Sequence, residues 1–443
     1  MKLSNWGQYP VIETDLKSPR RPAELASFLE GDGPLIARGL GRCYGDASLQ
    51  RRILSMTGCN RFLAFDEETG ELTCEAGLSL DEIVRVLLPR GWFLPVTPGT
   101  RFVTVGGAIA SDVHGKNHHL AGTFGDAVSR LELMDAAGRI HVCSPTENRD
   151  LFMATRGGMG LTGLILRASF RLIRVETAYI RQEVVRAPDL DGIMRLFEES
   201  ASWTYSVAWI DCLAGGASLG RSVLMRGEHA RRAELPDAAR LRQPLMPPPR
   251  RKLTVPFNLP ALLLNPWTVQ AFNAVYYRKA PGLPHMGLID YDAFFYPLDA
   301  IHHWNRIYGA RGFTQYQCVL PKAASHDALV RILHKIHRSH QGSFLAVLKL
   351  FGQPRAEAPL SFPREGYTLA LDFAMQPKLA PLLAALDEEV LAAGGRLYLA
   401  KDARQSAATF AAGYPELEAF RVLKRRIDPE ARFHSLQSQR LEI

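Results

Sequence analysis

Glycine is concentrated in one part of the chain, and this feature constrains the possible folds most strongly. Between Gly99 and Gly163 there are 11 glycines in 65 residues, whereas the whole chain of 443 residues has 36. Such a density predicts that the backbone approaches another group closely or adopts conformations that other residues avoid. We therefore expect this part of the chain to build a binding surface from its backbone.

The glycine-rich stretches form three clusters, at residues 37–46, 98–112 and 157–163. Successive glycines let backbone N–H groups converge on one point, and such a nest binds a phosphate or diphosphate without charged side chains. No cluster matches the P-loop pattern or a Rossmann fingerprint, and a single glycine-rich turn is usually only a turn. Three clusters in order within one region predict a dinucleotide site.

Short strands and helices alternate over the first 175 residues, which predicts an α+β region. Ser79 and Glu82 form a capping box that predicts an amphipathic helix over 79–90, ending at Gly91. The strands expected around it are residues 35–37, 53–55, 131–135 and 140–143, the last two forming a hairpin.

The character of the chain changes after about Glu176, where glycine thins out and aromatic residues gather, so we place a domain boundary there. Apolar residues at helical spacing predict helices over 329–336 and 379–390. The strands expected beside these helices are residues 315–320, 345–351, 367–373 and 396–400. This order of elements is one β-α-β-β-α-β unit.

The net charge of +8 is unevenly distributed. Residues 231–252 hold seven basic and two acidic side chains in a Pro-rich stretch, and nucleic-acid binders instead spread a basic face over a folded motif. We therefore expect no nucleic-acid partner. The stretch is either a mobile surface loop or a segment that docks on an anionic lipid surface.

The cysteines and the N-terminus indicate where the protein works. The 6 cysteines are far apart and include no C-x-x-C pair, which fits a reducing compartment. Residues 1–10 lack the apolar core of a signal peptide, and no stretch is apolar enough for a membrane-spanning helix. We expect a cytoplasmic protein, with peripheral association at the inner membrane surface as the alternative.

Two longer runs, Arg38–Asp46 and Thr104–His119, resemble the flavoproteins of the vanillyl-alcohol-oxidase type. Within that group the chain is similar to the decaprenylphosphoryl-β-D-ribose 2'-oxidase family, the flavin half of an arabinan-precursor epimerase. The His-Gly-Lys-Asn-His-His element is specific, and the resemblance covers nearly the whole chain. It continues through residues 304–306, 313–317, 349–352, 359–363, 397–404 and 428–429.

The resemblance implies a two-domain FAD-binding fold of the α+β class. An FAD-binding domain of the PCMH type would span residues 1–175, a ferredoxin-like substrate or cap domain residues 176–400, and residues 401–443 would return to the FAD domain. The residues implied to bind the cofactor are Arg38, Gly39, Leu40, Gly41, Arg42, Cys43, Tyr44, Gly45, Gly99, Thr100, Val105, Gly106, Gly107, Ser111, Asp112, His114, Gly115, Asn117, His118, Gly163 and Tyr398.

The same resemblance bears on how FAD is attached. In many relatives, the histidine of an R-G-x-G-H motif, directly after the second glycine, forms a covalent flavin bond. Its place falls at Arg42 here. We therefore expect noncovalent FAD.

Alcohol oxidation gives chemical roles to two residues. A hydride leaves carbon for the flavin while the hydroxyl proton leaves, so the site needs a base or a cation. Lys401 matches the family's essential lysine, and a lysine buried beside flavin has a lowered pKa. His114 would orient the substrate hydroxyl. Without the resemblance, Lys401 would be predicted to be an exposed residue at a strand end. His114, His118 and His119 could in principle bind a metal, but no carboxylate or cysteine at a recurring ligand spacing accompanies them, so we expect no metal site.

The substrate pocket is implied by four further residues: Lys116, Tyr296, Gln317 and Lys349. For the two tyrosines, Tyr296 and Tyr398, ordinary core packing is an equal alternative. Mycobacterial members carry a cysteine where this chain has Ala370, so we expect turnover to persist and sensitivity to thiol-directed inhibitors to be lost.

The leading hypothesis is an FAD-dependent oxidase acting on the 2'-hydroxyl of a polyprenylphosphoryl-β-D-ribose, with a separate NAD(P)H-dependent short-chain reductase completing the epimerisation. A soluble oxidase of alditols, sugars or sugar lactones is the alternative on the same fold. A flavin-binding partner subunit without catalysis is a third, which the retained Lys401 and His114 argue against.

Overall fold

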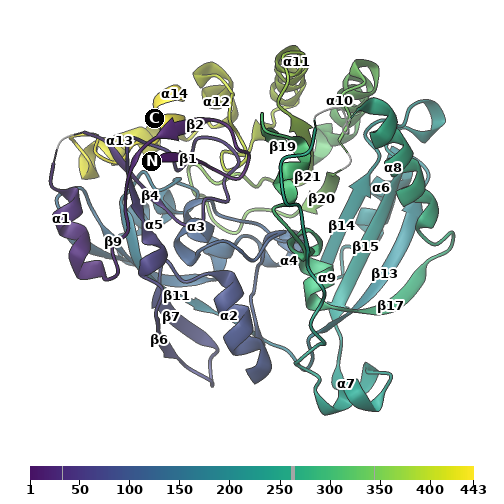
Figure 1. Cartoon of the computed structure of the whole chain (residues 1–443), viewed down its shortest axis with the longest axis horizontal. Helices are drawn as coiled ribbons and strands as arrows, with labels where there is room; N and C mark the ends of the chain where they lie inside the picture. The colour runs from purple at the N-terminus through teal and green to yellow at the C-terminus, as the bar shows by residue number, and fades with distance from the viewer. Residues whose placement is uncertain (32, 261–264, 344) are drawn as a thin grey trace.

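The computed structural model describes residues 1–31, 33–260, 265–343 and 345–443. Figure 1 shows two portions side by side: one is built from the N-terminal residues with the C-terminal helices above it, the other from the middle of the chain. Each portion is organised around its own antiparallel sheet, and a three-stranded parallel sheet joins the first. The class is therefore α+β, as predicted.

The N-terminal portion contains both parallel and antiparallel strands. Its three-stranded sheet has the order β3-β5-β4, and its five-stranded sheet the order β10-β9-β11-β7-β6. The strands are β1 (Lys2–Ser4), β2 (Val11–Glu13), β3 (Asp15–Lys17), β4 (Leu35–Arg38), β5 (Arg52–Ser55), β6 (Phe62–Phe65), β7 (Glu71–Glu75), β8 (Trp92–Phe93), β9 (Val128–Met134), β10 (Ile140–Cys143), β11 (Leu164–Arg171) and β12 (Ile173–Arg174). The helices are α1 (Leu25–Leu29), α2 (Leu80–Leu87), α3 (Val105–Ala110), α4 (His118–Ala121) and α5 (Arg149–Thr155).

The local predictions in this portion are confirmed. The side chain of Ser79 accepts from the Glu82 N–H at 3.1 Å while Glu82 accepts from the Ser79 N–H at 2.9 Å, so both unpaired donors at the start of α2 are satisfied. A 3₁₀ turn follows α2 and ends at Gly91, whose φ of +83° favours glycine. Strands β9 and β10 form the expected antiparallel hairpin.

The middle portion is built on an eight-stranded sheet with the order β17-β13-β15-β14-β20-β21-β19-β22. Its strands are β13 (Tyr179–Ala187), β14 (Tyr205–Ile210), β15 (Ser222–His229), β17 (His285–Asp290), β19 (Phe313–Pro321), β20 (Ala346–Phe351), β21 (Gly366–Ala374) and β22 (Arg396–Leu397). Its helices are α6 (Leu190–Glu199), α8 (Pro266–Lys279), α9 (Tyr291–Phe295), α10 (Ser325–Ser339) and α11 (Leu379–Ala392).

The predicted β-α-β-β-α-β unit is the second half of this sheet. Strands β19 to β22 follow one another in the chain but lie in the order β20-β21-β19-β22, with α10 and α11 as the connecting helices. The first half repeats this order with β13, β14, β15 and β17, a repetition that the sequence patterns did not reveal. The two halves meet where β14 pairs with β20.

One predicted strand is shorter than expected. Only Arg396 and Leu397 form β22, whereas residues 396–400 were expected to be a strand. Tyr398, Leu399 and Ala400 are buried in a turn, where the N–H of Lys401 donates to the Tyr398 carbonyl at 3.0 Å. Lys401 therefore lies in a packed turn and not at the end of a strand.

The basic Pro-rich stretch is exposed but not without structure. It contains a 3₁₀ turn at Arg232–Glu234 and the short helix α7 (Ala238–Arg242), which projects at the bottom of Figure 1. The Ala178 N–H donates to the Pro244 carbonyl at 2.8 Å, which ties the stretch to the residue just before β13. Beyond it, β16 (Leu253–Thr254) pairs with β18 (Ile301–His302).

The C-terminal residues pack on the N-terminal portion. They form α12 (Ala407–Gly413), α13 (Leu417–Ile427) and α14 (Leu436–Arg440). Arg440 pairs with Asp46 at 2.8 Å and with Asp402 at 2.9 Å, which ties the first glycine cluster to the turn that carries Lys401. Among the described residues, no helix has both the length and the apolar character that a membrane span requires.

Candidate active site

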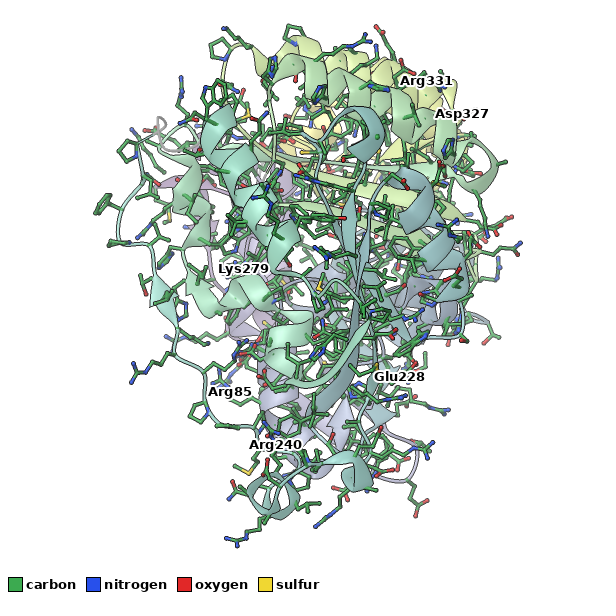
Figure 2. All side chains as sticks on the ribbon, turned by 90° about the vertical axis from the view of Figure 1, so that its right-hand side faces the viewer. Arg85, Glu228, Arg240, Lys279, Asp327 and Arg331 are labelled. Atoms are coloured by element: carbon green, nitrogen blue, oxygen red, sulfur yellow. The ribbon has the colours of Figure 1, made fainter. Side chains whose placement is uncertain are left out.

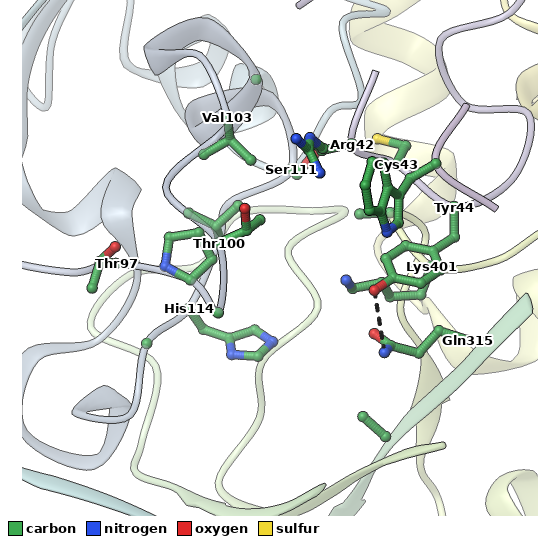
Figure 3. A pocket seen from close by; sticks show the side chains of 18 of the residues that line it. Arg42, Cys43, Tyr44, Thr97, Thr100, Val103, Ser111, His114, Gln315 and Lys401 are labelled. Carbon is green, nitrogen blue, oxygen red and sulfur yellow. Dashed lines mark hydrogen bonds between the residues drawn. The ribbon is translucent and has the colours of Figure 1, made fainter. Parts of the chain in front are cut away.

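A cavity of about 630 Å³ lies between the two portions and contains residues from all three glycine clusters. The opposite wall comes from the eight-stranded sheet and the turn after β22. Figure 3 shows Arg42, Ser111 and His114 on one side of this space and Gln315 and Lys401 on the other. The volume lies within the range of small-molecule and cofactor sites.

The glycine clusters present open backbone to the cavity. Gly99 has no heavy atom within 4 Å of the position that a Cβ would occupy, and at Gly107 only the Thr104 hydroxyl comes near. Gly41 has a φ of +64°, and a Cβ on Gly39 would stand 2.3 Å from Thr104 Oγ1. Both positions therefore require glycine, and the first two clusters touch each other. This backbone surface fits a dinucleotide carrying a diphosphate.

Lys401 lies in the cavity wall with its ammonium 4.0 Å from the centroid of the Tyr44 ring. Burial lowers its pKa, while the negative charge of Asp372 acts in the opposite direction. Loss of the proton is therefore easier than for an exposed lysine.

A hydrogen-bonded chain surrounds this lysine. Gln315 donates to Asp372 at 2.5 Å and to the Tyr44 hydroxyl at 3.5 Å, the contact drawn in Figure 3. The Tyr308 hydroxyl donates to the other oxygen of Asp372 at 3.3 Å. Because Asp372 is 1% exposed, burial raises its pKa.

His114 is buried among aromatic rings and hydrogen-bonding partners. Its Nε2 lies 3.1 Å from the Gln317 amide nitrogen, and its Nδ1 lies 3.5 Å from the Lys349 ammonium. Burial first, and then the charge of Lys349, lower its pKa well below the ordinary value. The imidazole is therefore neutral at pH 7 and acts as a hydrogen-bonding group.

Two further lysines give the cavity a cationic character. Burial, and to a smaller extent the charge of a neighbouring lysine, lowers the pKa of Lys349 to about 8 and that of Lys116 to about 7. Lys116 donates to the Phe294 carbonyl and lies 4.2 Å from the centroid of that residue's ring. An anion bound between these groups would favour their charged forms.

Arg42 stands where the resemblance would place a flavin-linked histidine. Its guanidinium lies 3.9 Å over the Trp6 ring and lines the cavity. Tyr398 also lines the cavity, and its hydroxyl donates to the Ser111 carbonyl at 2.8 Å.

Most of the residues predicted to form the site line this cavity. Those that do are Arg38, Gly39, Leu40, Gly41, Arg42, Cys43, Tyr44, Gly99, Thr100, Gly106, Gly107, Ser111, His114, Gly115, Lys116, Gly163, Gln317, Lys349, Tyr398 and Lys401.

Six predicted contact residues are not in the wall; they are Gly45, Val105, Asp112, Asn117, His118 and Tyr296. A Cβ on Gly45 would stand 2.1 Å from the Asp402 carbonyl oxygen, so its position is fixed by packing. Val105 and Tyr296 are fully buried in the core.

The remaining three of the six support the loops around the site. Asp112 accepts from the Ser361 hydroxyl at 2.6 Å and from the Gly125 N–H at 3.1 Å. Asn117 donates to the Pro95 carbonyl at 2.8 Å, and the His118 ring lies 4.3 Å from the Phe351 ring. The His-Gly-Lys-Asn-His-His element thus contains both residues that line the cavity and residues that support the surrounding loops.

Several cavity residues were missed in the sequence. Gln315 lies in a run quoted for the resemblance but was not assigned to the site. Trp209 and Tyr276 were counted only as part of the aromatic-rich region, and Phe272 was not singled out. The alternation of β14 marks Val207 and Trp209 as one face, but it does not show that this face meets a cavity.

Comparison with known proteins gives the family. A family model for an FAD binding domain matches residues 23–144. The decaprenylphosphoryl-beta-D-ribose oxidase of Mycolicibacterium smegmatis is 39% identical over 452 aligned residues, covering 100% of this chain and 97% of that protein. The chain belongs to the decaprenylphosphoryl-β-D-ribose oxidase family. As a member of that family, the protein is an FAD-dependent oxidoreductase.

Other relatives share less with this member of the decaprenylphosphoryl-β-D-ribose oxidase family. An uncharacterized protein from the mprA 5' region of Streptomyces coelicolor is 36% identical over 375 residues, which cover 83% of this chain and 100% of that protein. The L-gulonolactone oxidase of Scyliorhinus torazame is 29% identical over 189 residues, 41% of this chain and 42% of that protein. The resemblance found in the sequence and the expected fold class are confirmed.

Proposed function

We propose that the protein oxidises the 2'-hydroxyl of a polyprenylphosphoryl-β-D-ribose to the 2'-ketone, with noncovalently bound FAD. One observation carries this proposal. Lys401, His114, Gln317 and Lys349 come from different parts of the chain but line one cavity with the glycine clusters. The full-length relative is named as an oxidase of such a lipid-linked ribose.

The residues of this cavity account for both halves of an alcohol oxidation. When bound, FAD supplies the hydride acceptor. Lys401, with its lowered pKa, accepts the hydroxyl proton in its neutral form. Neutral His114 orients the substrate hydroxyl, while Gln317 holds the imidazole.

The anionic part of the substrate fits the other two lysines. Lys349 and Lys116 line the cavity without an ion pair to a carboxylate among the described contacts, so a phosphate diester would supply their counter-charge. A free sugar has no group that would meet this need. This distinction favours a phosphorylated lipid over the alditols and sugar lactones that other enzymes of this fold oxidise.

Noncovalent attachment follows from the residue at position 42. An arginine cannot form the flavin bond that histidine forms in relatives, and the Arg42 guanidinium is instead stacked on Trp6. We expect acid precipitation of the protein to release all of its flavin into the supernatant. Flavin that stays with the precipitated protein would contradict this part of the proposal.

The keto product has a direct consequence for the pathway. A ketone at C2' gives the arabinose configuration only after hydride returns to the opposite face, so a separate NAD(P)H-dependent reductase must follow. We place the enzyme in the cytoplasm or at the inner face of the membrane, where such a cofactor is available.

The position of oxidation is tested by trapping the product. The enzyme is incubated with farnesylphosphoryl-β-D-ribofuranose and a dye as electron acceptor, and the product is reduced with borodeuteride. We expect deuterium at C2' and a mixture of ribose and arabinose after hydrolysis. Deuterium at another carbon, or none, would overturn the proposal.

A further inference from the structure

The cavity continues beyond the glycine clusters into an apolar end that the hydride chemistry does not use. Its walls there come from the first half of the eight-stranded sheet, from β20 and from α8. We call this end the apolar channel and define it by Val207, Trp209, Met225, Phe272, Tyr276 and Val347.

The sheet forms the floor of the apolar channel. Val207 and Trp209 alternate along β14 with Ala208 and Ile210, which belong to the core on the helix-covered face. Strand geometry therefore turns the first pair toward the cavity. Trp209 pairs across the sheet with Val347 of β20, so the floor is continuous from one half of the sheet to the other.

Helix α8 forms the other wall and is anchored at the strand ends. Asn273 donates to Asp211 just after β14 at 2.8 Å, and the Tyr277 hydroxyl donates to the Ala187 carbonyl at the end of β13 at 3.3 Å. These contacts hold the Tyr276 ring 4.7 Å from the Trp209 ring. Phe272, one turn earlier, is 45% exposed at the same wall.

The apolar channel begins beside the lysine that we assign to the phosphate. Lys349 and Val347 are two residues apart on β20, so their side chains lie on the same face, about 7 Å apart along the strand. A lipid phosphate on Lys349 therefore has its first apolar atoms next to Val347 and Trp209. We propose that the apolar channel under α8 binds the first isoprene units of the substrate's polyprenyl chain.

This inference rests on the proposed function for the identity of the ligand, but it concerns a different part of the cavity. Branched, unsaturated C5 units match a wall of aromatic and β-branched side chains, and binding would cover the half-exposed Phe272. Figure 2 shows Lys279, the last residue of α8, on the outer face of the molecule. The apolar channel thus lies under a helix that faces the solvent.

The test uses lipid phosphates that have no sugar to oxidise. Binding of dimethylallyl, geranyl and farnesyl phosphate to the FAD-loaded enzyme is measured by calorimetry, below their aggregation concentrations. We expect affinity to rise with chain length, and the F272A/Y276A variant to bind farnesyl phosphate about tenfold more weakly. Dimethylallyl phosphate should bind both proteins alike.

A matched control lies on the same helix. Val275 is 51% exposed and is not a cavity residue, so V275A should bind all three phosphates like the wild type. Equal affinities along the chain-length series, or equal losses in V275A and F272A/Y276A, would overturn the inference. Chain-length-dependent binding without oxidation of the ribosyl lipid would refute the proposed function and leave the apolar channel standing.

Discussion

At the scale of single residues, the cavity gathers positive charge away from water. Lys116, Lys349 and Lys401 line it together, and burial lowers the pKa of each. Burying ammonium groups costs free energy unless an anion accompanies them. The substrate phosphate fulfils this role in our interpretation, and two predictions depend on it.

The first prediction concerns pH. Lys116 and Lys349, with pKa values lowered to about 7 and about 8, are charged at pH 6 and largely neutral at pH 9. A neutral amine attracts a phosphate weakly, so KM for farnesylphosphoryl-ribose should rise by more than about tenfold over this interval. The kcat should rise at the same time, because Lys401 accepts a proton only when neutral. A KM that stays flat from pH 6 to 9 would contradict the phosphate role of the lysines.

The second prediction concerns Lys349 alone. Lys349→Met keeps the apolar stem and removes the charge, and we expect KM for farnesylphosphoryl-ribose to rise about tenfold to a hundredfold. The KM for free ribose, measured in the same dye-linked assay at concentrations far above those of the lipid, should hardly change. Lys378→Met, at an exposed position just before α11, is the control. Equal effects of Lys349→Met on both substrates would rule out a phosphate contact.

At the scale of elements, the sequence correctly predicted those helices and strands whose own side chains determine their structure. The capping box of α2, the hairpin β9–β10 and the apolar stripes of α10 and α11 are examples. The end of β22 was misjudged because residues 398–400 are apolar and buried, and a buried turn has the same signature as a buried strand.

Long-range pairing explains what the sequence could not reveal. The first half of the eight-stranded sheet (β13, β14, β15 and β17) has the same strand order as the second half, but its sequence does not repeat. Many different sequences with alternating apolar and polar residues can form the same strands. The glycine clusters were found from the sequence alone, and Lys401 came from the resemblance. Gln315 and Asp372 join the site only through cross-strand pairing of β19 and β21. Gly45 was predicted to touch the cofactor, but the structure packs it against the Lys401 turn.

The third prediction follows from that packing. In Gly45→Ala the new methyl group would stand 2.1 Å from the Asp402 carbonyl oxygen, so the turn carrying Lys401 must move. We expect kcat, measured by steady-state kinetics, to fall more than about tenfold. The free energy of unfolding, measured by thermal denaturation, should fall by about 1–3 kcal/mol. The matched control is Gly287→Ala, whose nearest neighbouring atom is 3.9 Å away. Wild-type kcat in Gly45→Ala would show that the turn tolerates displacement.

At the scale of the whole molecule, the surface near the cavity combines basic and apolar groups. Leu253 directly follows Arg250, Arg251 and Lys252, and Phe257 comes four residues later; their side chains are 67% and 63% exposed. Such a surface suits an anionic bilayer, from which a polyprenyl lipid must come. Peripheral membrane association therefore remains our prediction for this face.

The fourth prediction tests that face with vesicles. We expect the protein to sediment with vesicles containing phosphatidylglycerol at low salt, but not with pure phosphatidylcholine. Because each basic residue contributes about 1 kcal/mol, R250A/R251A/K252A should bind about a hundredfold more weakly. The R20A/R21A variant, at exposed arginines of the N-terminal portion, should bind like the wild type. Equal sedimentation of all three proteins would refute the assignment.

The most direct measurement is an anaerobic titration of the purified protein, followed through the flavin absorbance near roughly 450 nm. We predict that stoichiometric farnesylphosphoryl-β-D-ribofuranose bleaches this band, whereas free ribose and alditols at the same concentration leave it unchanged. Bleaching by free sugars alone would make the protein a carbohydrate oxidase, and a protein without bound flavin would contradict the whole interpretation.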